Sequence, residues 1–284
     1  MEGKVDIRPS PISGRWYPGE PKRLSESVDL YMDQARLPVI EGEVLGVMAP
    51  HAGHLYSGPV AGYAFAAVRG LVPELVAVVS PMHQPYTPLL LTSSHTAYST
   101  PLGEVTVDKY ALQELEDLLK DRLGTGLAPV RCDTEHSLEI ELPFLQRALS
   151  SNFQLLPVMV RNQSAEVAHT LGMALAKVLA GKNALLVAST DLSHFYPANT
   201  AKTLDTEILR RVEAFDPLSM LEAEAQGKGF ACGKGALAAV MWAAKELGAD
   251  KAQLLHYANS GDITGDYTEV VGYGSAVFIR RSKK

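Results

Sequence analysis

Short aliphatic runs alternate along the chain with longer segments whose apolar residues recur at helical spacing. The short runs predict strands, and most are continuously apolar, which is typical of strands buried on both faces of a sheet. They cover residues 44–49, 75–80, 89–91, 154–160, 184–189, 252–256 and 274–279. The longer segments predict helices over residues 21–36, 58–68, 108–123, 165–180, 200–215 and 233–247.

This alternation predicts an α/β fold with a largely parallel or mixed central sheet between helical layers. Ser164 before the fourth predicted helix and Gly181 after it are residues that favour a helix start and a helix stop. No flexible linker, internal repeat or shift of composition divides the sequence. We therefore expect a single domain over residues 1–284.

The composition and net charge exclude several classes of protein. The 284 residues include 26 Lys+Arg and 32 Asp+Glu, for a formal net charge of −6, which argues against a nucleic acid as partner. A hydrophobic content of 46% excludes wholesale disorder. The apolar runs are too short to span a bilayer, and charges and prolines stand where a signal peptide needs an apolar run. Two cysteines make no disulfide framework, so we expect a cytoplasmic protein with no membrane contact.

Polar side chains follow three of the predicted strands. His51 follows the first strand, His83 follows the second, and a later strand leads into Asp191, with His194 three residues further on. Open α/β sheets bind ligands at the carboxyl ends of their strands. One histidine after a strand is most often an ordinary loop residue, but three polar strand ends together favour a binding site.

Two histidines with a third donor are a common arrangement for a transition metal. The residues alone leave the third donor open between Asp191, His194, Cys232 and a glutamate of residues 135–141. Cys232 precedes a predicted helix, whose N-terminus would favour the thiolate. The alternative for Cys232 is a small buried apolar residue, the commonest state of an isolated cysteine.

The segment DTEHSLEIELPFL, residues 133–145, holds four carboxylates and a histidine. Helical spacing would place Glu135 and Glu139 on one face, whereas its aliphatic residues alternate as in a strand, so the period is ambiguous. Such a run ordinarily forms a solvated face, but the PFL sequence that ends it indicates packing against the core. We expect His136 to lie in the pocket and assign the glutamates a lesser part.

Other polar and aromatic residues are interpreted as structural. They include Cys132, His95, His169 and His256. The aromatic residues could line the mouth of a pocket, but aromatic residues near a sheet edge more often pack, so we assign them to packing; they are Trp16, Tyr56, Tyr86 and Tyr98. The sequence contains no phosphate-binding loop, no dinucleotide-binding loop in a strand–helix context and no nucleophile elbow.

The sequence resembles the Memo family over almost its whole length. The segments that carry the resemblance occur in the family's order: SGRWYP, APHAGHLYSG, SPMHQP, YSTPLGEVTVD, DTEHSLEIELPFL, LLVASTDLSHF, ACGKGAL and YGSAVF. The resemblance implies one α/β domain similar to class III extradiol ring-cleaving dioxygenases. It also implies a metal pocket of two histidines and one cysteine, which are His51, His83 and Cys232 here.

The resemblance implies further partners and residues. His136, Asp191 and His194 match polar positions near the metal pocket, and iron and copper are both associated with family members. Prokaryotic members are grouped with a radical-SAM protein and a third component, in the AmmeMemoRadiSam system. The vertebrate member is described as an adaptor that binds phosphotyrosine peptides.

Two departures from these patterns bear on the chemistry. Ring-cleaving dioxygenases hold Fe(II) with two histidines and a carboxylate, whereas Cys232 is a softer and oxidisable donor that favours Cu(I). Gln84 follows His83, where many relatives of the family have a second histidine. Extradiol ring cleavage is therefore not the reaction that these residues favour.

Three functional hypotheses follow. The first is an Fe(II)- or Cu-dependent redox enzyme acting on a small molecule or peptide, with His136 or His194 as general acid or base and Asp191 orienting a histidine or a ligand. The second is a non-catalytic module that binds a peptide or a small anion. The third is a subunit of a modification system that needs its radical-SAM partner.

Overall fold

Three parallel strands, β2, β9 and β3, lie side by side at the centre of the main sheet and end at the same edge. The computed structural model describes residues 6–282. Its strands are β1 (Ile7–Arg8), β2 (Glu43–Ala49), β3 (Leu75–Pro81), β4 (Leu90–Ser93), β5 (Ala97–Thr100), β6 (Gly103–Thr106), β7 (Ala128–Val130), β8 (Gln154–Val160), β9 (Ala184–Ser189), β10 (His194–Tyr196), β11 (Lys251–Asn259) and β12 (Val270–Arg280).

The main sheet is mixed and has nine strands, in the order β10-β12-β2-β9-β3-β8-β4-β7, with β11 paired to β12. β2, β9, β3 and β8 are parallel, whereas β12 runs antiparallel to β2 and β4 runs antiparallel to β8. A separate small sheet joins β1, β5 and β6. This arrangement confirms the predicted α/β class with a mixed central sheet.

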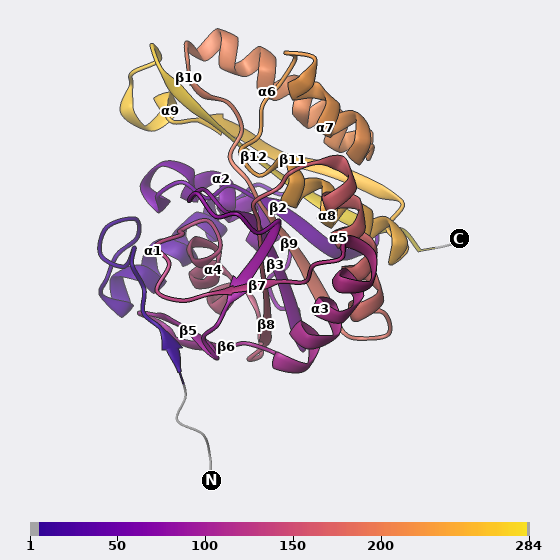
Figure 1. Cartoon of the computed structure of the whole chain (residues 1–284). Coiled ribbons are helices and arrows are strands. Elements are labelled where there is room, and N and C mark those ends of the chain that lie inside the picture. Colours follow the sequence, from indigo (N-terminus) through magenta and orange to yellow (C-terminus); the bar gives the residue numbers. More distant parts are fainter. Residues whose placement is uncertain (1–5, 283–284) are drawn as a thin grey trace.

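Helices cover both faces of the main sheet (Figure 1). They are α1 (Pro21–Gln34), α2 (His54–Ala66), α3 (Lys109–Leu123), η1 (Glu139–Glu141), α4 (Leu142–Ala148), α5 (Ala165–Leu179), α6 (Ala198–Glu213), α7 (Pro217–Ala225), α8 (Lys234–Glu246) and α9 (Gly261–Thr264). Alternate strand residues enter two cores, as pleated geometry requires. In β3, Val76 and Val78 join the core under α1, α2 and α4, whereas Ala77 and Val79 join the core under α3, α5 and α8.

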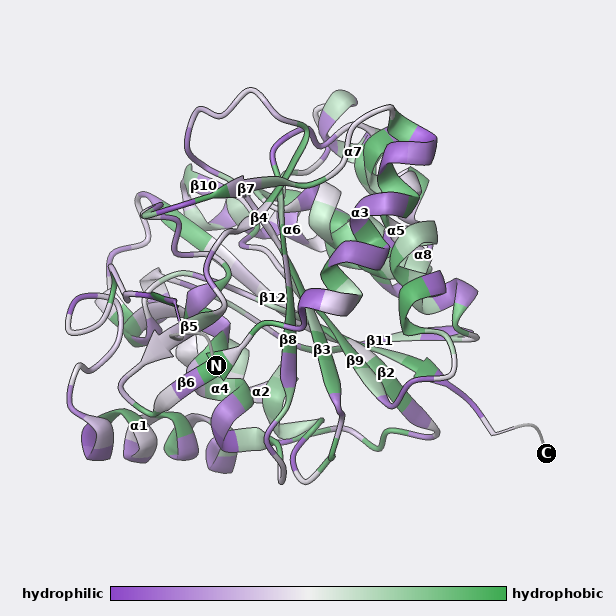
Figure 2. Ribbon diagram, turned by 60° about the horizontal axis from the view of Figure 1, so that its bottom comes forward, coloured by the Kyte–Doolittle hydropathy of each residue, from purple (hydrophilic) through white to green (hydrophobic). Residues whose placement is uncertain are grey.

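Every predicted helix and strand is present; β8 and β9 have the predicted bounds, and the ends of the others are shifted. The green central strands and the striped helices in Figure 2 show why: the strands are apolar on both faces, and the helices on one. The pattern missed β1, β5, β6, β7 and β10, because strands of two to four residues are too short to show a period. It also missed α4 and α7, in which a proline stands in the first turn.

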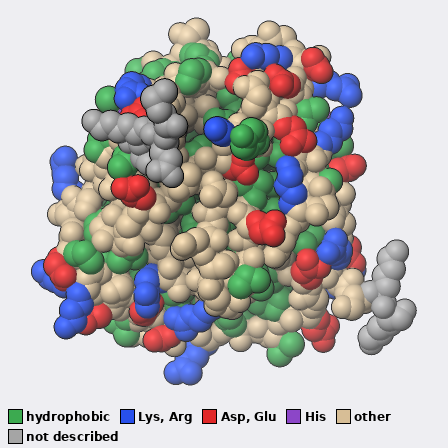
Figure 3. Space-filling view, turned by 90° about the horizontal axis from the view of Figure 1, so that it is seen from below, with side chains coloured by type: hydrophobic (Ala, Val, Ile, Leu, Met, Phe, Trp, Pro, Cys, Tyr) green, Lys and Arg blue, Asp and Glu red, His purple; other side chains and the backbone are tan. Residues whose placement is uncertain are grey.

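Charged residues are spread over the surface. On the face seen in Figure 3, basic and acidic side chains are interspersed with hydrophobic ones. Among residues 6–282, no helix is both long enough and apolar enough to cross a membrane.

Candidate metal site at the carboxyl edge of the sheet

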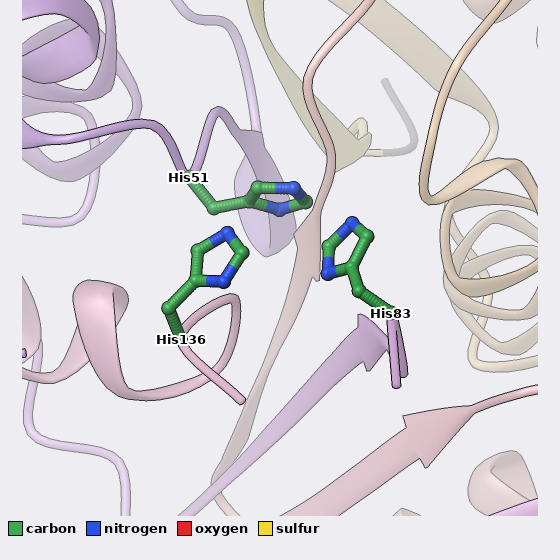
Figure 4. A group of neighbouring side chains, drawn as sticks. All are labelled: His51, His83 and His136. Atoms are coloured by element: carbon green, nitrogen blue, oxygen red, sulfur yellow. The ribbon is translucent and has the colours of Figure 1, made fainter. Parts of the chain in front are cut away.

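Three histidine side chains point toward one another beside the carboxyl ends of β2 and β3 (Figure 4). His51 follows β2, His83 follows β3, and His136 lies in the segment between β7 and η1. Each offers one ring nitrogen, and these three nitrogens lie within 4.8 Å of one another. Imidazole nitrogens at this spacing can hold a metal ion.

His51 is buried and makes three polar contacts. Its backbone N–H donates to Asp191 Oδ1 at 2.7 Å, and its ring Nδ1 lies 2.9 Å from Ser189 Oγ at the end of β9. Its other ring nitrogen, Nε2, lies 3.1 Å from Cys232 Sγ. Nε2 is therefore the His51 atom that faces the cluster, with a thiol beside it.

Glu135 holds the other two histidines. Its Oε1 lies 2.9 Å from His83 Nδ1 and 3.3 Å from His136 Nδ1, and its two oxygens accept the backbone N–H groups of both residues. The two imidazole rings stack, with centroids 5.0 Å apart and an interplanar angle of 13°. A carboxylate on Nδ1 leaves Nε2 of His83 free for a metal, which is the usual arrangement around metal-bound histidines.

The electrostatics of the cluster favour neutral imidazoles. Burial lowers the pKa of His136 to about 4 and, together with the neighbouring His136 and His83, holds the pKa of His51 well below its usual range. Burial acts to raise the pKa of Glu135, but the hydrogen bond and charge of His83, the Ser137 backbone N–H and the charge of His136 together outweigh it, so this pKa is lowered. The site therefore combines two uncharged imidazoles, those of His51 and His136, with the ionised carboxylate of Glu135.

Cys232 lies just before α8, but its thiol form is favoured. Burial raises the pKa of the thiol, and the charge of Asp191 raises it further. The expectation that the helix N-terminus would favour a thiolate is wrong for the metal-free protein, because desolvation of the sulfur outweighs the helix dipole. The Asp191 backbone N–H still points at the sulfur, at 3.3 Å.

Asp191 is itself buried, and burial raises its pKa to about 7 against the effect of the His51 and Ala52 backbone N–H groups. His194 lies outside the three-histidine cluster. Its Nδ1 is 2.8 Å from the Leu192 carbonyl oxygen, and its ring packs near Phe195 and Phe230. Of the two predicted acid–base groups, His136 is therefore part of the cluster and His194 is not.

A buried arginine that the sequence pattern did not indicate stabilises the segment that carries Glu135. Arg8 in β1 is 2% exposed and pairs with Asp133 at 2.8 Å and with Glu139. Its Nη2 also donates to the Glu135 carbonyl oxygen at 2.8 Å, and the Glu135 backbone N–H donates to Asp133. The four carboxyl groups of residues 133–141 are therefore buried rather than solvated, and two of them, Asp133 and Glu139, are paired with Arg8.

A cavity of about 540 Å³ adjoins the cluster. Its lining includes Arg15, Trp16, Tyr56 and Phe195, and the Trp16 ring lies 4.1 Å from that of His136. Phe195 is 69% exposed and has a positive φ of 61°, a conformation that strains a bulky residue. The assignment of Trp16 and Tyr56 to packing alone is wrong, because both side chains face this cavity.

Cys132, His95, His169 and His256 are not part of the cluster. Cys132 is exposed, His95 is buried and lies 3.1 Å from Asp6, His169 is exposed on α5, and His256 stacks on Tyr63. Tyr98 is buried in the core, and Gln84 lies 2.6 Å from Thr134 Oγ1, beside Glu135.

The sequence indicated the glutamates of residues 135–141 only as possible metal donors, not as groups that orient the histidines, and it gave no indication of Ser189 or Arg8. The period of residues 133–141 carries no signal for the role of the glutamates, because an extended segment followed by one 3-10 turn has neither a helical nor a strand repeat. The available signal was compositional, since four carboxylates next to an apolar PFL sequence need buried partners.

Comparison with known proteins agrees with this architecture. The family model described as Memo-like protein matches residues 8–277. A MEMO1 family protein of Nitrosopumilus maritimus is 35% identical over 278 residues, covering 96% of this chain and 100% of its own length. Relatives from Methanosarcina mazei (34%; 96% and 99% covered) and Methanopyrus kandleri (32%; 95% and 98% covered) are also described as MEMO1 family proteins. The chain therefore belongs to the Memo family.

Proposed function

We propose that this chain is a metal-dependent redox enzyme that binds Fe(II) or Cu through His51, His83 and Cys232. The observation that carries the proposal is the convergence of three imidazoles within 4.8 Å, with the Cys232 sulfur 3.1 Å from His51 Nε2. Imidazole suits iron and copper, and a thiolate strengthens the preference for Cu(I). A redox-active ion bound here would supply electron transfer to or from a substrate.

The residues fit such an ion by their donor chemistry. Ser189 and Glu135 occupy the Nδ1 atoms of His51 and His83, so the Nε2 atoms remain as ligands. Binding would release the Cys232 proton, since a metal ligand must be the thiolate. His136 lies within the same cluster, so it is either a fourth donor or the acid–base group beside the ion.

Residues around the metal site would position its ligands and transfer protons. Asp191 holds the His51 backbone, and the His136 ring packs against Trp16, which lines the adjoining cavity. A largely neutral imidazole is able to accept a proton from a substrate. His194 would serve as a second acid–base group on the side of Phe195.

Metal analysis of protein purified without oxygen tests the proposal. We expect near-stoichiometric iron or copper in the wild-type protein, and its loss in His51→Ala and Cys232→Ser. His169→Ala, which removes an exposed histidine on α5, is the matched control and should retain the metal. Wild-type metal content in both site variants would overturn the assignment.

Cobalt substitution separates the possible donor sets. If Cys232 is a ligand, the Co(II) protein shows a thiolate charge-transfer band that Cys232→Ser abolishes. If the set is instead His51, His83 and His136, the band is absent from the wild type and His136→Ala releases the metal.

The adjoining cavity favours a second candidate function, a module that binds a peptide or a small anion. Its aromatic lining provides a stacking surface, Arg15 provides one cationic group, and Asp266 and Glu269 provide two carboxylates, so an aromatic peptide fits this lining better than a free anion does. Binding of an aromatic peptide that survives chelation would support this function, and loss of all binding on chelation would count against it. Action with a radical-SAM partner stays a prediction from the family.

A further inference from the structure

A buried carboxyl group lies behind His51. Glu141 is 1% exposed, its Oε1 lies 2.6 Å from Ser189 Oγ, and its Oε2 has no hydrogen-bond partner. Among the described residues, no lysine, arginine or histidine nitrogen pairs with it within 4.0 Å. An ionised carboxylate in such surroundings would be very costly.

Ser189 connects this carboxyl group to the metal site. Its Oγ has three polar neighbours: the Ser137 carbonyl oxygen at 2.6 Å, Glu141 Oε1 at 2.6 Å and His51 Nδ1 at 2.9 Å. A hydroxyl group has one proton to donate and two lone pairs that accept. Three contacts at these distances use all of its capacity.

Counting protons assigns each contact. A carbonyl oxygen only accepts, so the Ser189 proton goes to Ser137, and Oγ must accept from the other two neighbours. Glu141 then has to carry a proton on Oε1, and His51 has to carry its proton on Nδ1. If Glu141 were ionised, one serine proton would face two acceptors at 2.6 Å, and one pair of oxygens would be in contact without a proton.

We propose that Glu141 is a neutral carboxylic acid that acts through Ser189 to hold His51 as the Nδ1–H tautomer. This tautomer directs the Nε2 lone pair at Cys232 and at the site where a metal would bind. Glu141 is thus a positioning residue, and the consequence for metal binding rests on the proposed function. Burial is also expected to raise the pKa of Glu141 well above its usual range, in agreement with the proton count.

The two ligand histidines are consequently oriented by different groups. His83 meets an ionised carboxylate, Glu135, whereas His51 meets a neutral hydroxyl backed by a neutral acid. A carboxylate on Nδ1 makes an imidazole more basic, and a hydroxyl does not.

The wild-type protein tests the proposal without metal. Nitrogen-15 chemical shifts of labelled histidine at neutral pH report which ring nitrogen of His51 carries the proton, and infrared difference spectra against Glu141→Gln report a protonated carboxyl. We expect the Nδ1–H tautomer and a carboxylic acid band that the substitution removes. The Nε2–H tautomer, or the absence of that band, overturns the proposal.

Two variants test the path through Ser189. Glu141→Gln keeps a neutral donor beside the hydroxyl, so the tautomer should persist and Co(II) affinity should change less than about threefold. Ser189→Ala removes the acceptor of the Nδ1 proton, so we expect a shift towards Nε2–H and a loss of Co(II) affinity of about 10- to 100-fold. Unchanged tautomer and affinity in a folded Ser189→Ala protein overturn it. If instead the wild type binds no metal, the proposed function fails while the tautomer result stands.

Discussion

Cys232 Sγ lies 3.1 Å from Nε2 of His51, although 181 positions separate the two residues in the chain. The contact joins the end of β2 to the residue before α8, and the Cys232 backbone N–H donates to the Asp191 carbonyl oxygen between them. A protonated sulfur at this distance donates its hydrogen to the Nε2 lone pair of His51. A metal bound here would take the place of that proton on the sulfur.

The raised pKa of Cys232 predicts slow alkylation that still accelerates at alkaline pH. Because the thiolate is the nucleophile, the rate at Cys232 in metal-free protein should rise about tenfold per pH unit between about pH 7 and pH 9. Peptide mass spectrometry after iodoacetamide treatment measures it, with the exposed Cys132 as internal reference for reagent access. A rate at Cys232 that levels off near neutral pH would show that the thiolate already predominates there.

Glu135→Gln should weaken metal binding without unfolding the chain. The amide is isosteric but loses the negative charge that orients His83 and His136, so we expect Co(II) affinity to fall about 10- to 100-fold. Titration followed by visible absorbance measures the affinity. Glu26→Gln, on the exposed face of α1, is the matched control and should bind as the wild type does. Equal Co(II) affinities for the two variants would show that Glu135 does not contribute to metal binding.

Arg8→Met should be strongly destabilising. It leaves Asp133 and Glu139 as unpaired buried carboxylates, a change that costs about 3–5 kcal/mol of the free energy of unfolding. Denaturant titration measures the cost. The control is Arg69→Ala, which breaks the exposed pair with Asp33 and should cost less than about 1 kcal/mol. Similar costs for the two substitutions would contradict a structural role for the buried pairs.

The lowered pKa of His54 predicts that the folded protein loses stability in mild acid. Burial lowers its folded-state pKa to about 4 from the usual 6.5, so the unfolded chain takes up a proton first as the pH falls. The contribution is therefore complete above about pH 6.5 and is lost on the way down to pH 4, by about 2 kcal/mol between pH 7.5 and pH 5. His54→Gln should remove this part of the pH slope in denaturant titrations, and His169→Gln should not. An unchanged slope in His54→Gln would mean that the histidine is already charged in the folded protein.

Gly272→Ala should destabilise the strand beside His194. A Cβ at Gly272 would lie 1.8 Å from Asp205 Oδ2, and that carboxyl is held by the Ser193 N–H and the Tyr257 hydroxyl. We expect a loss of about 1–3 kcal/mol, measured by thermal unfolding. Gly53→Ala makes only an ordinary contact at 3.4 Å and should change stability by less than about 1 kcal/mol. Equal stability of the two variants would show that Asp205 is free to move.

Part of the site could be predicted because parallel strands end at one edge. β2, β9 and β3 are neighbours and parallel, so His51, Asp191 and His83 had to emerge near one another. Their apolar residues made the strands recognisable, and Pro50 and Pro81 marked where the chain leaves the sheet after β2 and β3.

The pattern of residues predicted the α/β class, the positions of the longer helices and strands, the three polar strand ends, a pocket position for His136 and, through the motifs, the family. Only the three-dimensional structure shows that the His136 ring converges with His51 and His83, that Glu135 and Ser189 orient these rings, and that Arg8 and Glu141 are buried behind them. Local periodicity records only which face of an element is buried. The orientation of a side chain in an irregular segment depends on partners that are distant in sequence, and Arg8 meets Glu139 across 131 positions.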